Sequence, residues 1–331
     1  MGVSTSVDPG SVLLAIDAGN SKTDVAFVGA DGTVLATARS GGFRPTAAGT
    51  EAAVDVLAAA VTEAAGRLPG PDRPVARHVS ACLANADLPV EEHELTGALA
   101  RRGWGRTVEV RNDTFAVLRA GVDAPRGVAV VCGAGINCVG MLPDGRTARF
   151  PALGTMSGDW GGGGGLAEEA LWHAARAEDG RGGPTALARA LPGHFGLGSM
   201  AELIEELHLG RVPRSRMHEL VPVLFAVAAA GDPAAGGLVA RQADEVVAMV
   251  TVALRRLDAL GEDIPVLLGG SVLAAGHREL NGRIREQLAA VAPRAAVSVV
   301  TAPPVLGAAL LGLDAMAAEP SAYAKLRAHF G

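Results

Sequence analysis

Two short apolar runs near the start of the chain, 12–16 and 25–28, flank a polar segment of Asp, Gly, Asn, Ser, Lys and Thr. Apolar runs of this length, bounded by turn residues, are typical of buried strands. The pattern therefore predicts a β-hairpin over 12–28 with a polar tip. A turn at 30–32 and the residues 33–39 predict a third antiparallel strand beside it.

Helix-like spacing of the apolar residues then alternates with short strand-like runs, as expected for an α/β architecture. The predicted helices are 51–67, 90–102 and 113–120, and the predicted strands between them are 75–83 and 107–111. Pro69, Gly70 and Pro71 end the first of these helices.

The same order of elements then starts again. A second apolar hairpin is predicted over 127–132 and 136–141, with Gly133, Ala134 and Gly135 as its tip, and a third strand near 146–150. Strands at 265–268 and 296–300 and helices at 278–291 and 304–313 complete the second copy. This duplicated order predicts two similar α/β domains that face one another, which we place at 1–118 and 119–331. The last predicted helix, 304–313, can pack back on the first domain.

A helical insertion at about 161–260 interrupts the second copy. Its predicted helices are 166–177, 184–191, 199–207, 218–230 and 233–260. Five consecutive glycines at 161–165 precede the first of them. A run of glycines serves as a flexible linker, or it allows the backbone to approach a ligand or a neighbouring strand closely. Both interpretations remain open from the sequence.

Length, charge and cysteine use exclude several classes of protein. At 331 residues the chain is long enough for two cores, and its net charge of -6 gives no general attraction to nucleic acid or anionic lipid. No run of about 20 apolar residues indicates a membrane span, and the N-terminus lacks the pattern of a signal peptide. Cys82, Cys132 and Cys138 lie in apolar runs, as reduced thiols of a cytoplasmic protein do.

The tip of the first hairpin has the chemistry of an anion site. Small residues allow backbone N–H groups to approach phosphate oxygens, and Lys22 and Thr23 add a charge and a hydroxyl. Asp17, at the end of the first strand, can hold Mg²⁺ through water. An ordinary hairpin turn fits the same residues, and the common phosphate loop with its Gly-Lys-Ser/Thr ending is absent. If the two domains face each other, both tips grip a polyphosphate from two sides.

Three segments resemble the nucleotide motifs of the superfamily that includes sugar kinases, actin and heat-shock-protein-70. Residues 17–23, Asp-Ala-Gly-Asn-Ser-Lys-Thr, are similar to its first phosphate motif. Residues 133–140, Gly-Ala-Gly-Ile-Asn-Cys-Val-Gly, are similar to its second. Residues 267–273, Leu-Leu-Gly-Gly-Ser-Val-Leu, resemble its adenosine motif.

Within this superfamily, residues 12–313 resemble the N-acetylglucosamine kinase and BadF/BadG/BcrA/BcrD ATPase-type family. Supporting segments are 112–114 (Asn-Asp-Thr), 157–159 (Ser-Gly-Asp) and 179–182 (Asp-Gly-Arg-Gly). The resemblance implies two duplicated actin-like, ribonuclease H-like domains with a central cleft. It implies an ATP- and Mg²⁺-dependent kinase for a hydroxyl of a small sugar or amino sugar, such as N-acetylglucosamine or glucosamine, and it is compatible with a homodimer.

The resemblance also assigns roles to single residues. Asp17 orders Mg²⁺, and the phosphates are bound by Gly19, Asn20, Ser21, Lys22 and Thr23 from one side and by Gly133, Ala134 and Gly135 from the other. Gly269, Gly270 and Ser271 flank the nucleoside. Asn112, Asp113, Asn137, Gly158 and Asp159 face the sugar.

Asp113 matches the general base of these kinases. A sugar hydroxyl that attacks phosphorus must lose its proton as the new bond forms, and a carboxylate also orients the attacking oxygen. The residues alone favour a helix cap for Asn112-Asp113-Thr114, which is a common use of Asn and Asp. The resemblance favours the general base.

Two segments depart from the family pattern. The family has Gly-Asp-Glu-Gly where this chain has Gly158-Asp159-Trp160-Gly161, so an indole replaces a carboxylate. The loop at 41–46 lacks the Asn that reads the sugar in many of these kinases, and its Arg44 can face an anionic group of the substrate instead. These changes leave the phosphate motifs intact and leave the identity of the sugar open.

Two alternatives belong to other functional classes. An ATPase of the dehydratase-activator type would drive a partner enzyme and hold an iron–sulfur cluster with cysteines, whereas Cys132 and Cys138 flank a hairpin tip. A non-catalytic sugar sensor would bind the ligand and signal through a partner. ATP turnover measured across a panel of sugars separates the three hypotheses.

Overall fold

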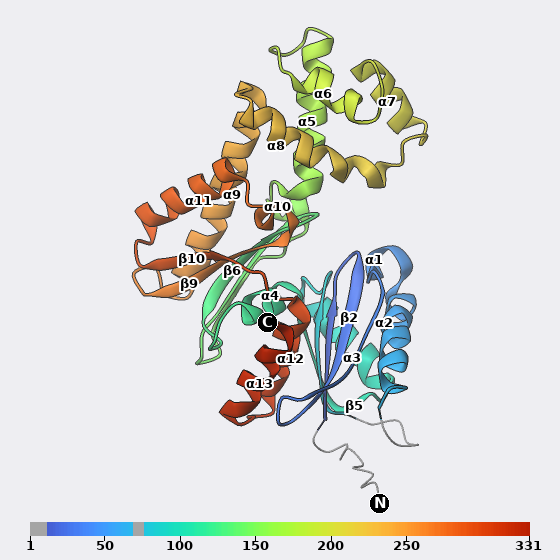
Figure 1. The fold of residues 1–331 in the computed structure, drawn as a ribbon, viewed down its shortest axis with the longest axis vertical. Helices are drawn as coiled ribbons and strands as arrows, with labels where there is room; N and C mark the ends of the chain where they lie inside the picture. Colours follow the sequence, from blue (N-terminus) through green and yellow to red (C-terminus); the bar gives the residue numbers. More distant parts are fainter. Residues whose placement is uncertain (1–11, 69–75) are drawn as a thin grey trace, which may run out of the picture. The chain divides into compact units, whose positions relative to one another are not determined.

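The structure, a computed structural model, describes residues 12–68 and 76–331. The described residues form two compact units, shown with their elements in Figure 1. The first comprises the described residues up to Ala129, Val139–Thr147 and Val300–Gly331; the second comprises Val130–Cys138 and Ala148–Val299. The predicted break at 69–71 and the first residue of the predicted strand 75–83 lie outside the described residues.

A five-stranded sheet in the order β3-β2-β1-β4-β5 forms the centre of the first unit. Its strands are β1 (Val12–Ala18), β2 (Lys22–Gly29), β3 (Val34–Gly41), β4 (Ala76–Leu83) and β5 (Gly105–Asn112). Strands β1, β2 and β3 are antiparallel, whereas β4 and β5 continue from β1 in parallel. Because Ala18 pairs with Leu83 and Leu83 with Asn112, the carboxyl ends of three strands meet at one edge of the sheet.

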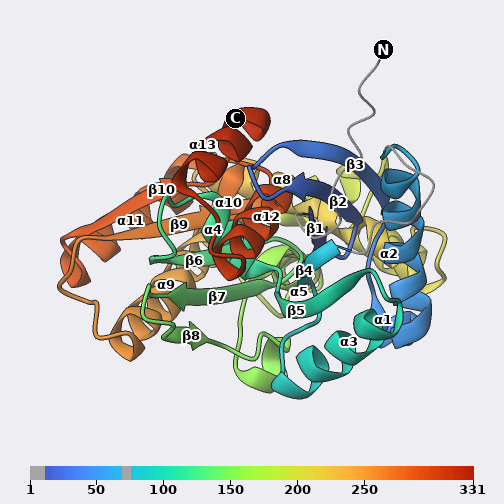
Figure 2. The ribbon, with the colours of Figure 1, turned by 90° about the horizontal axis from the view of Figure 1, so that it is seen from below.

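Helices cover both faces of this sheet, which explains why every residue of β1 is buried. The helices are α1 (Pro45–Ala48), α2 (Thr50–Ala65), α3 (Pro89–Arg101), α4 (Thr114–Ala120), α12 (Pro304–Ala315) and α13 (Pro320–Phe330). Leu14 and Ile16 belong to a core cluster with Val54 and Leu57 of α2. Leu13 points the other way, where it would touch a Cβ atom on Gly312 of α12. Figure 2 shows α2 and α3 on one side of the sheet and α12 on the other.

The C-terminal helix α12 is therefore a core element of the first unit. The Ser80 hydroxyl of β4 donates to the Ala308 carbonyl at 2.7 Å. Gly307 lies so close to α4 that a Cβ atom there would fall 1.8 Å from the Ala116 carbonyl oxygen. Glycine is thus required for the approach of the two helices.

The second five-stranded sheet has the order β10-β9-β6-β7-β8. Its strands are β6 (Gly127–Cys132), β7 (Ile136–Met141), β8 (Thr147–Arg149), β9 (Ile264–Gly269) and β10 (Ala295–Val299), and β9 and β10 are parallel. The helices of the second unit are α5 (Gly162–Glu178), α6 (Leu187–His194), α7 (Met200–His208), α8 (Leu220–Ala229), α9 (Pro233–Arg256), α10 (Gly270–Ala274) and α11 (Arg278–Val291). Short 3-10 helices lie at Gly154–Ser157 and Arg214–Glu219.

The two five-stranded sheets confirm the predicted α/β fold with two strand-rich units and a helical insertion. Several elements differ from the expectation. Helix α5 begins at Gly162, inside the glycine run and not after it, and α9 ends at Arg256, short of 260. Helices α1, α10 and α13 were not predicted.

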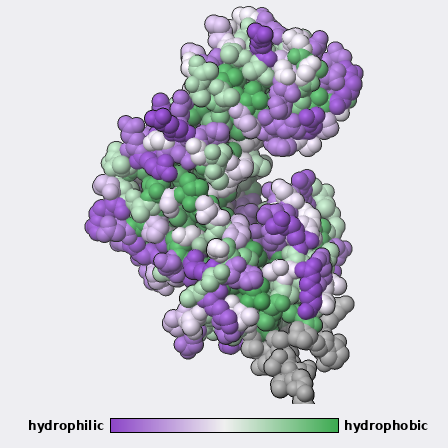
Figure 3. All heavy atoms as spheres, viewed as in Figure 1, coloured by the Kyte–Doolittle hydropathy of each residue, from purple (hydrophilic) through white to green (hydrophobic). Residues whose placement is uncertain are grey.

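The hydrophilic surface and the hydropathy of the helices give little information on membrane association. On the face shown in Figure 3, hydrophilic side chains gather over α7 and α11. Among the described residues, no single helix is both long and apolar enough to cross a bilayer. Arg214–Ala229 and Pro233–Arg256 reach such hydropathy only as a pair, across a bend of 111°.

Candidate functional site

The first hairpin tip lies at the carboxyl edge of the first sheet. Gly19 donates its amide to the Lys22 carbonyl at 2.9 Å, which closes the tip, and Asn20, Ser21 and Lys22 are exposed. The Lys22 ammonium lies 3.1 Å from the Asp24 carboxylate. The side chains of Ser21 and Lys22 are thus in reach of a ligand.

Thr23 differs from its neighbours, because its side chain is completely buried. Its hydroxyl donates to the Gly41 carbonyl at 2.9 Å and so ties β2 to the end of β3. In this conformation Thr23 supports the tip from behind, and its hydroxyl does not face solvent. The sequence pattern could not distinguish this position from that of Ser21.

The loop after β3 closes on the same tip. Phe43 donates its amide to the Gly19 carbonyl at 2.9 Å, and Arg44 donates through Nε to the Asn20 carbonyl at 2.8 Å. Asn85, after β4, donates to the Asn20 side-chain oxygen at 3.2 Å. Arg44 is thus held beside the tip and is an exposed residue.

The ends of β4 and β5 bring Asn112 and Asp113 to this edge. Asn112 is 2% exposed and donates to Asp87 at 2.8 Å, while its side-chain oxygen accepts the Thr114 amide at 2.9 Å. Asn112 thus makes a local turn bond to the first residue of α4. Asp113 occupies the N-cap position of α4 without a side-chain capping bond.

The two carboxyl groups of the first unit have strongly shifted pKa values. The pKa of Asp17 is raised to about 8, mainly by burial. The charges of Asp113 and Asp24 also raise this pKa, whereas the charge of Lys22 lowers it. Burial also raises the pKa of Asp113 to about 6, although hydrogen bonds from Thr114 oppose the shift. Carboxyl groups with such shifts at one sheet edge are typical of functional sites.

Asp17 fits the metal-binding role implied by its position. A buried carboxylate beside two further acidic groups is unfavourable as an anion, and a divalent cation would remove that penalty. Among the described residues, no group of three or more His, Cys, Asp or Glu side chains forms a complete metal site. Asp17 would therefore hold Mg²⁺ together with water and phosphate oxygens.

The second hairpin tip is built together with the glycine run of α5. Gly163 donates to the Gly133 carbonyl at 2.7 Å, and Gly164 donates to the Ala134 carbonyl at 2.8 Å. A Cβ atom on Gly162 would lie 2.4 Å from the Gly135 carbonyl carbon. The run is therefore a close backbone contact with the tip and not a flexible linker.

Gln242 of α9 fixes the start of α5. Its side-chain oxygen accepts the Gly162 amide at 2.9 Å, and the side chain is completely buried. A Cβ atom on Gly161 would lie 2.2 Å from that oxygen. The sequence carried no signal for this contact, because it joins residues 80 positions apart.

The adenosine-like motif spans the end of β9 and the start of α10. Gly270 has a φ of +80°, and a Cβ atom there would lie 2.4 Å from the Cys132 carbonyl oxygen. The need for glycine at this position thus comes from the neighbouring strand β6. Gly269 is buried and Ser271 is exposed.

The three cysteines are free and buried. Burial raises the pKa of the Cys132 thiol to about 12 and raises the pKa values of Cys82 and Cys138 as well. Thiols of this kind are unreactive at neutral pH.

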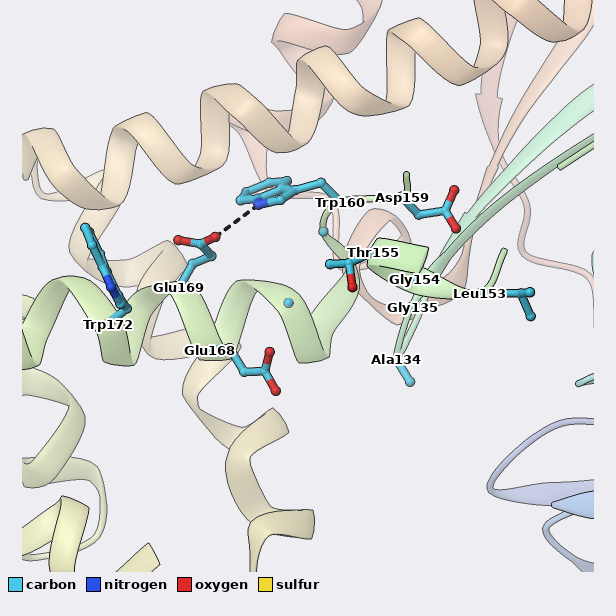
Figure 4. A pocket seen from close by; sticks show the side chains of 12 residues that line it. Ala134, Gly135, Leu153, Gly154, Thr155, Asp159, Trp160, Glu168, Glu169 and Trp172 are labelled. Atoms are coloured by element: carbon cyan, nitrogen blue, oxygen red, sulfur yellow. Dashed lines mark hydrogen bonds between the residues drawn. The ribbon is translucent and has the colours of Figure 1, made fainter. Parts of the chain in front are cut away.

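A pocket of about 690 Å³ opens beside the second tip, entirely within the second unit. It is lined by Ala134, Gly135, Leu153, Gly154, Thr155, Asp159, Trp160, Gly161, Gly165, Glu168, Glu169 and Trp172. Figure 4 shows Asp159 and the tip residues at one end of the pocket and Trp172 at the other. Most of these residues were not predicted, because they come from three separate segments.

Among the predicted sugar residues of the second unit, Asp159 lines the pocket. The Ser157 hydroxyl donates to it at 2.5 Å, and Gly158 adopts a φ of +86° just before it. Asn137 lies on β7, where its side-chain oxygen accepts the Cys138 amide at 2.7 Å. Neither Asn137 nor Gly158 is among the pocket-lining residues.

Trp160, at the position where the family pattern has Glu, also lines the pocket. Its indole N–H donates to Glu169 at 3.1 Å, which Figure 4 marks, and the Arg241 guanidinium lies 4.1 Å from the ring centroid. A hydrogen bond and a cation–π contact thus fix the indole.

The chain resembles characterised kinases over most of its length. It is 24% identical to the N-acetylmuramic acid/N-acetylglucosamine kinase of Clostridium acetobutylicum, over 79% of this chain and 85% of that protein. It is also 24% identical to the N-acetyl-D-glucosamine kinase of Dictyostelium discoideum, over 92% and 98% of the two chains.

Solved structures share the fold. The crystal structure of a candidate N-acetylglucosamine kinase from Chromobacterium violaceum matches with a TM-score of 0.68 at 22% identity, over 92% of this chain and 100% of that one. The model of the BadF/BadG/BcrA/BcrD ATPase family matches residues 14–312. By this match, which spans both sheets and the helical insertion, the chain belongs to the BadF/BadG/BcrA/BcrD ATPase family.

Proposed function

We propose that this protein is an ATP-dependent kinase that transfers the γ-phosphate to a hydroxyl of a sugar or amino sugar, with Asp113 as the general base. The observation that carries the proposal is the position of Asp113 at the carboxyl edge of the first sheet, near Asp17, with its pKa raised to about 6. Membership of an ATPase family and the names of two curated relatives support the same reaction.

Asp113 suits the chemistry of proton removal. A base is most effective when its pKa lies close to the working pH, because it is then mostly ionised and still accepts a proton readily. A pKa of about 6 meets both conditions near neutral pH. The Asp113 side chain makes no capping bond to α4, so capping does not occupy its carboxylate.

Each hairpin tip, taken by itself, has the chemistry to bind phosphate oxygens of ATP in this proposal. The exposed Ser21 and Lys22 of the first tip supply a hydroxyl and a positive charge. Gly133 and Gly135 of the second tip allow close approach, since a Cβ atom at either position would meet nothing within 4 Å. Asp17 holds Mg²⁺, which neutralises phosphate charge when bound.

The pocket beside the second tip receives the sugar. Asp159 accepts hydrogen bonds from sugar hydroxyls at the end nearest the tip, and the apolar face of the Trp160 indole suits the C–H face of a sugar ring. N-acetylglucosamine and glucosamine are the acceptors to test first, since both named relatives act on N-acetylglucosamine.

The test is ADP formation across a panel of glucose, glucosamine, N-acetylglucosamine, N-acetylmannosamine and N-acetylmuramic acid. We expect turnover that depends on one or more of these sugars and on Mg²⁺. We expect Asp113→Asn to lower kcat by a factor of about 10² to 10⁴ while ATP still binds. Sugar-independent ATP hydrolysis that persists in Asp113→Asn would overturn the proposal and favour an ATPase that acts on a partner.

A further inference from the structure

One face of helix α5 forms the long wall of the pocket. Gly165, Glu168, Glu169 and Trp172 all line it, and their spacing of three, four and seven positions puts them on one side of a helix. At 1.5 Å per residue, this wall is about 10 Å long. It extends well beyond the end where the second hairpin tip and Asp159 lie (Figure 4).

The pocket is larger than one sugar ring requires. Its volume of about 690 Å³ is in the range of sites for ligands of drug size, and a single hexose fills only part of it. The part next to Trp172 is the part left over, because the phosphate-binding tip is at the opposite end.

Gly165 keeps this wall open. A Cβ atom at Gly165 would meet nothing within 4 Å, and its φ lies outside the left-handed region. Neither packing nor backbone conformation therefore requires glycine there, in contrast to Gly162. Glycine inside a helix costs about 1 kcal/mol relative to alanine. The missing side chain leaves this part of the pocket wall open.

Trp172 at the far end presents a fixed aromatic surface. Its side chain is 53% exposed, although exposure of an indole to water is unfavourable. The Arg176 guanidinium lies 4.6 Å from the ring centroid, and His173 meets the ring edge-on at 4.8 Å. An aromatic ring held in this way, beside the carboxylates of Glu168 and Glu169, has the composition of a sugar-stacking site.

From this arrangement we propose that the acceptor is longer than one sugar ring: a disaccharide or a glycoside whose second ring stacks on Trp172. The inference rests on the proposed sugar kinase function and specifies its substrate class. The first ring lies beside Asp159 at the end nearest the hairpin tip. The second ring follows the α5 wall, where the Glu168 carboxylate accepts bonds from its hydroxyls; this side chain forms no hydrogen bond or ion pair with the described residues.

The experiment compares kcat/KM for N-acetylglucosamine and for its β-linked disaccharide in the wild-type protein, in Trp172→Ala and in Gly165→Leu. We expect the disaccharide to have at least a tenfold higher kcat/KM in the wild type. Trp172→Ala should lower kcat/KM for the disaccharide about tenfold and leave the value for the monosaccharide within twofold. Gly165→Leu should lower both values of kcat/KM, because it fills the pocket at the end nearest the hairpin tip.

Gly237→Leu is the matched control for Gly165→Leu. Gly237 lies in helix α9, a Cβ atom there would also meet nothing within 4 Å, and it is not part of the pocket. It should leave both values of kcat/KM unchanged. A loss in this control equal to that in Gly165→Leu would assign the effect to helix distortion and overturn the role of Gly165.

The outcomes separate the inference from the function on which it rests. Turnover of the monosaccharide with no gain for the disaccharide, and no effect of Trp172→Ala, overturns the longer acceptor and leaves the kinase intact. Absence of turnover with every sugar overturns the kinase itself. If Trp172→Ala lowers both values equally and changes the oligomeric state in size-exclusion chromatography, Trp172 belongs to a subunit interface and the inference fails.

Discussion

Arg119 of α4 and Asp314 of α12 form an ion pair through two hydrogen bonds, at 2.8 and 3.1 Å. The Arg119 side chain is only 1% exposed, and its third nitrogen donates to the Val122 carbonyl. The pair thus fastens the helix that starts at Asp113 to a helix from the end of the chain. Its position makes it a determinant of both stability and site geometry.

Removal of Asp314 should be costly. Asp314→Ala leaves a buried guanidinium without its counter-ion, which typically destabilises a protein by about 3–5 kcal/mol. Urea unfolding of the ligand-free protein measures this difference. Glu63→Ala is the control, because it removes an exposed pair with Arg67 that is worth about 0.3–0.5 kcal/mol. Equal effects of the two substitutions would show that the Arg119 pair is not essential to the core.

Two glycines of the same run should respond in opposite directions. Gly162→Ala places a Cβ atom against the Gly135 backbone at a φ of +73° and should destabilise the second unit. Gly165→Ala meets no obstacle and should stabilise helix α5, by up to about 1 kcal/mol. Thermal unfolding of both variants tests this contrast. Destabilisation by Gly165→Ala would contradict the assignment of Gly165 to the pocket wall.

Activity should fall on the acid side of neutrality. The base must be unprotonated to accept the hydroxyl proton, so kcat/KM should decrease below pH about 6 and approach a tenfold loss per pH unit. A profile of kcat/KM from pH 5 to 9, with ionic strength held constant, measures the midpoint. The residual activity of Asp113→Asn should not show this decrease in kcat/KM at acid pH. If the decrease persists in the variant, another group is responsible for the titration.

In the absence of ligand and metal, ionisation of the buried Asp17 carboxyl group should lower the free energy of unfolding. Its pKa is about 8 in the folded protein but about 4 in an unfolded chain. Between these values the folded state holds a proton that the unfolded state has lost, so stability declines as pH rises from about 4 to 8.

Asp17→Asn should flatten that decline and raise stability at pH 8 by on the order of 2 kcal/mol in EDTA. The same variant should lose sugar-dependent turnover. Unfolding in urea at pH 5 and pH 8 measures the change in slope. Equal slopes in wild type and variant would show that another group causes the pH dependence.

The sequence was most informative where the pattern of apolar residues is local. Both hairpins were predicted with bounds close to those of β1, β2, β6 and β7. Two apolar runs joined by a short tip of turn residues indicate a hairpin from the local sequence alone. The helices of the insertion were predicted to within a few residues for the same reason. The domain boundary after 118 and the homodimer stay predictions.

Contacts between distant segments escaped prediction. The glycine run appeared to precede a helix, since glycine is a poor helix former, yet contact with the second hairpin tip makes 162–165 the first turn of α5. Thr23 and Ser21 look alike in sequence, but only the fold shows that Thr23 is buried against Gly41. The wall of the pocket is also formed by segments that are distant in the sequence, so the sequence did not predict it.

The bond from Ser80 to Ala308 joins residues 228 positions apart. During translation, the first sheet therefore leaves the ribosome long before the helix that covers one of its faces. At about 5–20 residues per second, the delay is on the order of 10–50 s. For that time an apolar sheet face is open to chaperones or to other nascent chains. The folding of this protein should consequently depend more on the cell's chaperones than its thermodynamic stability alone would suggest.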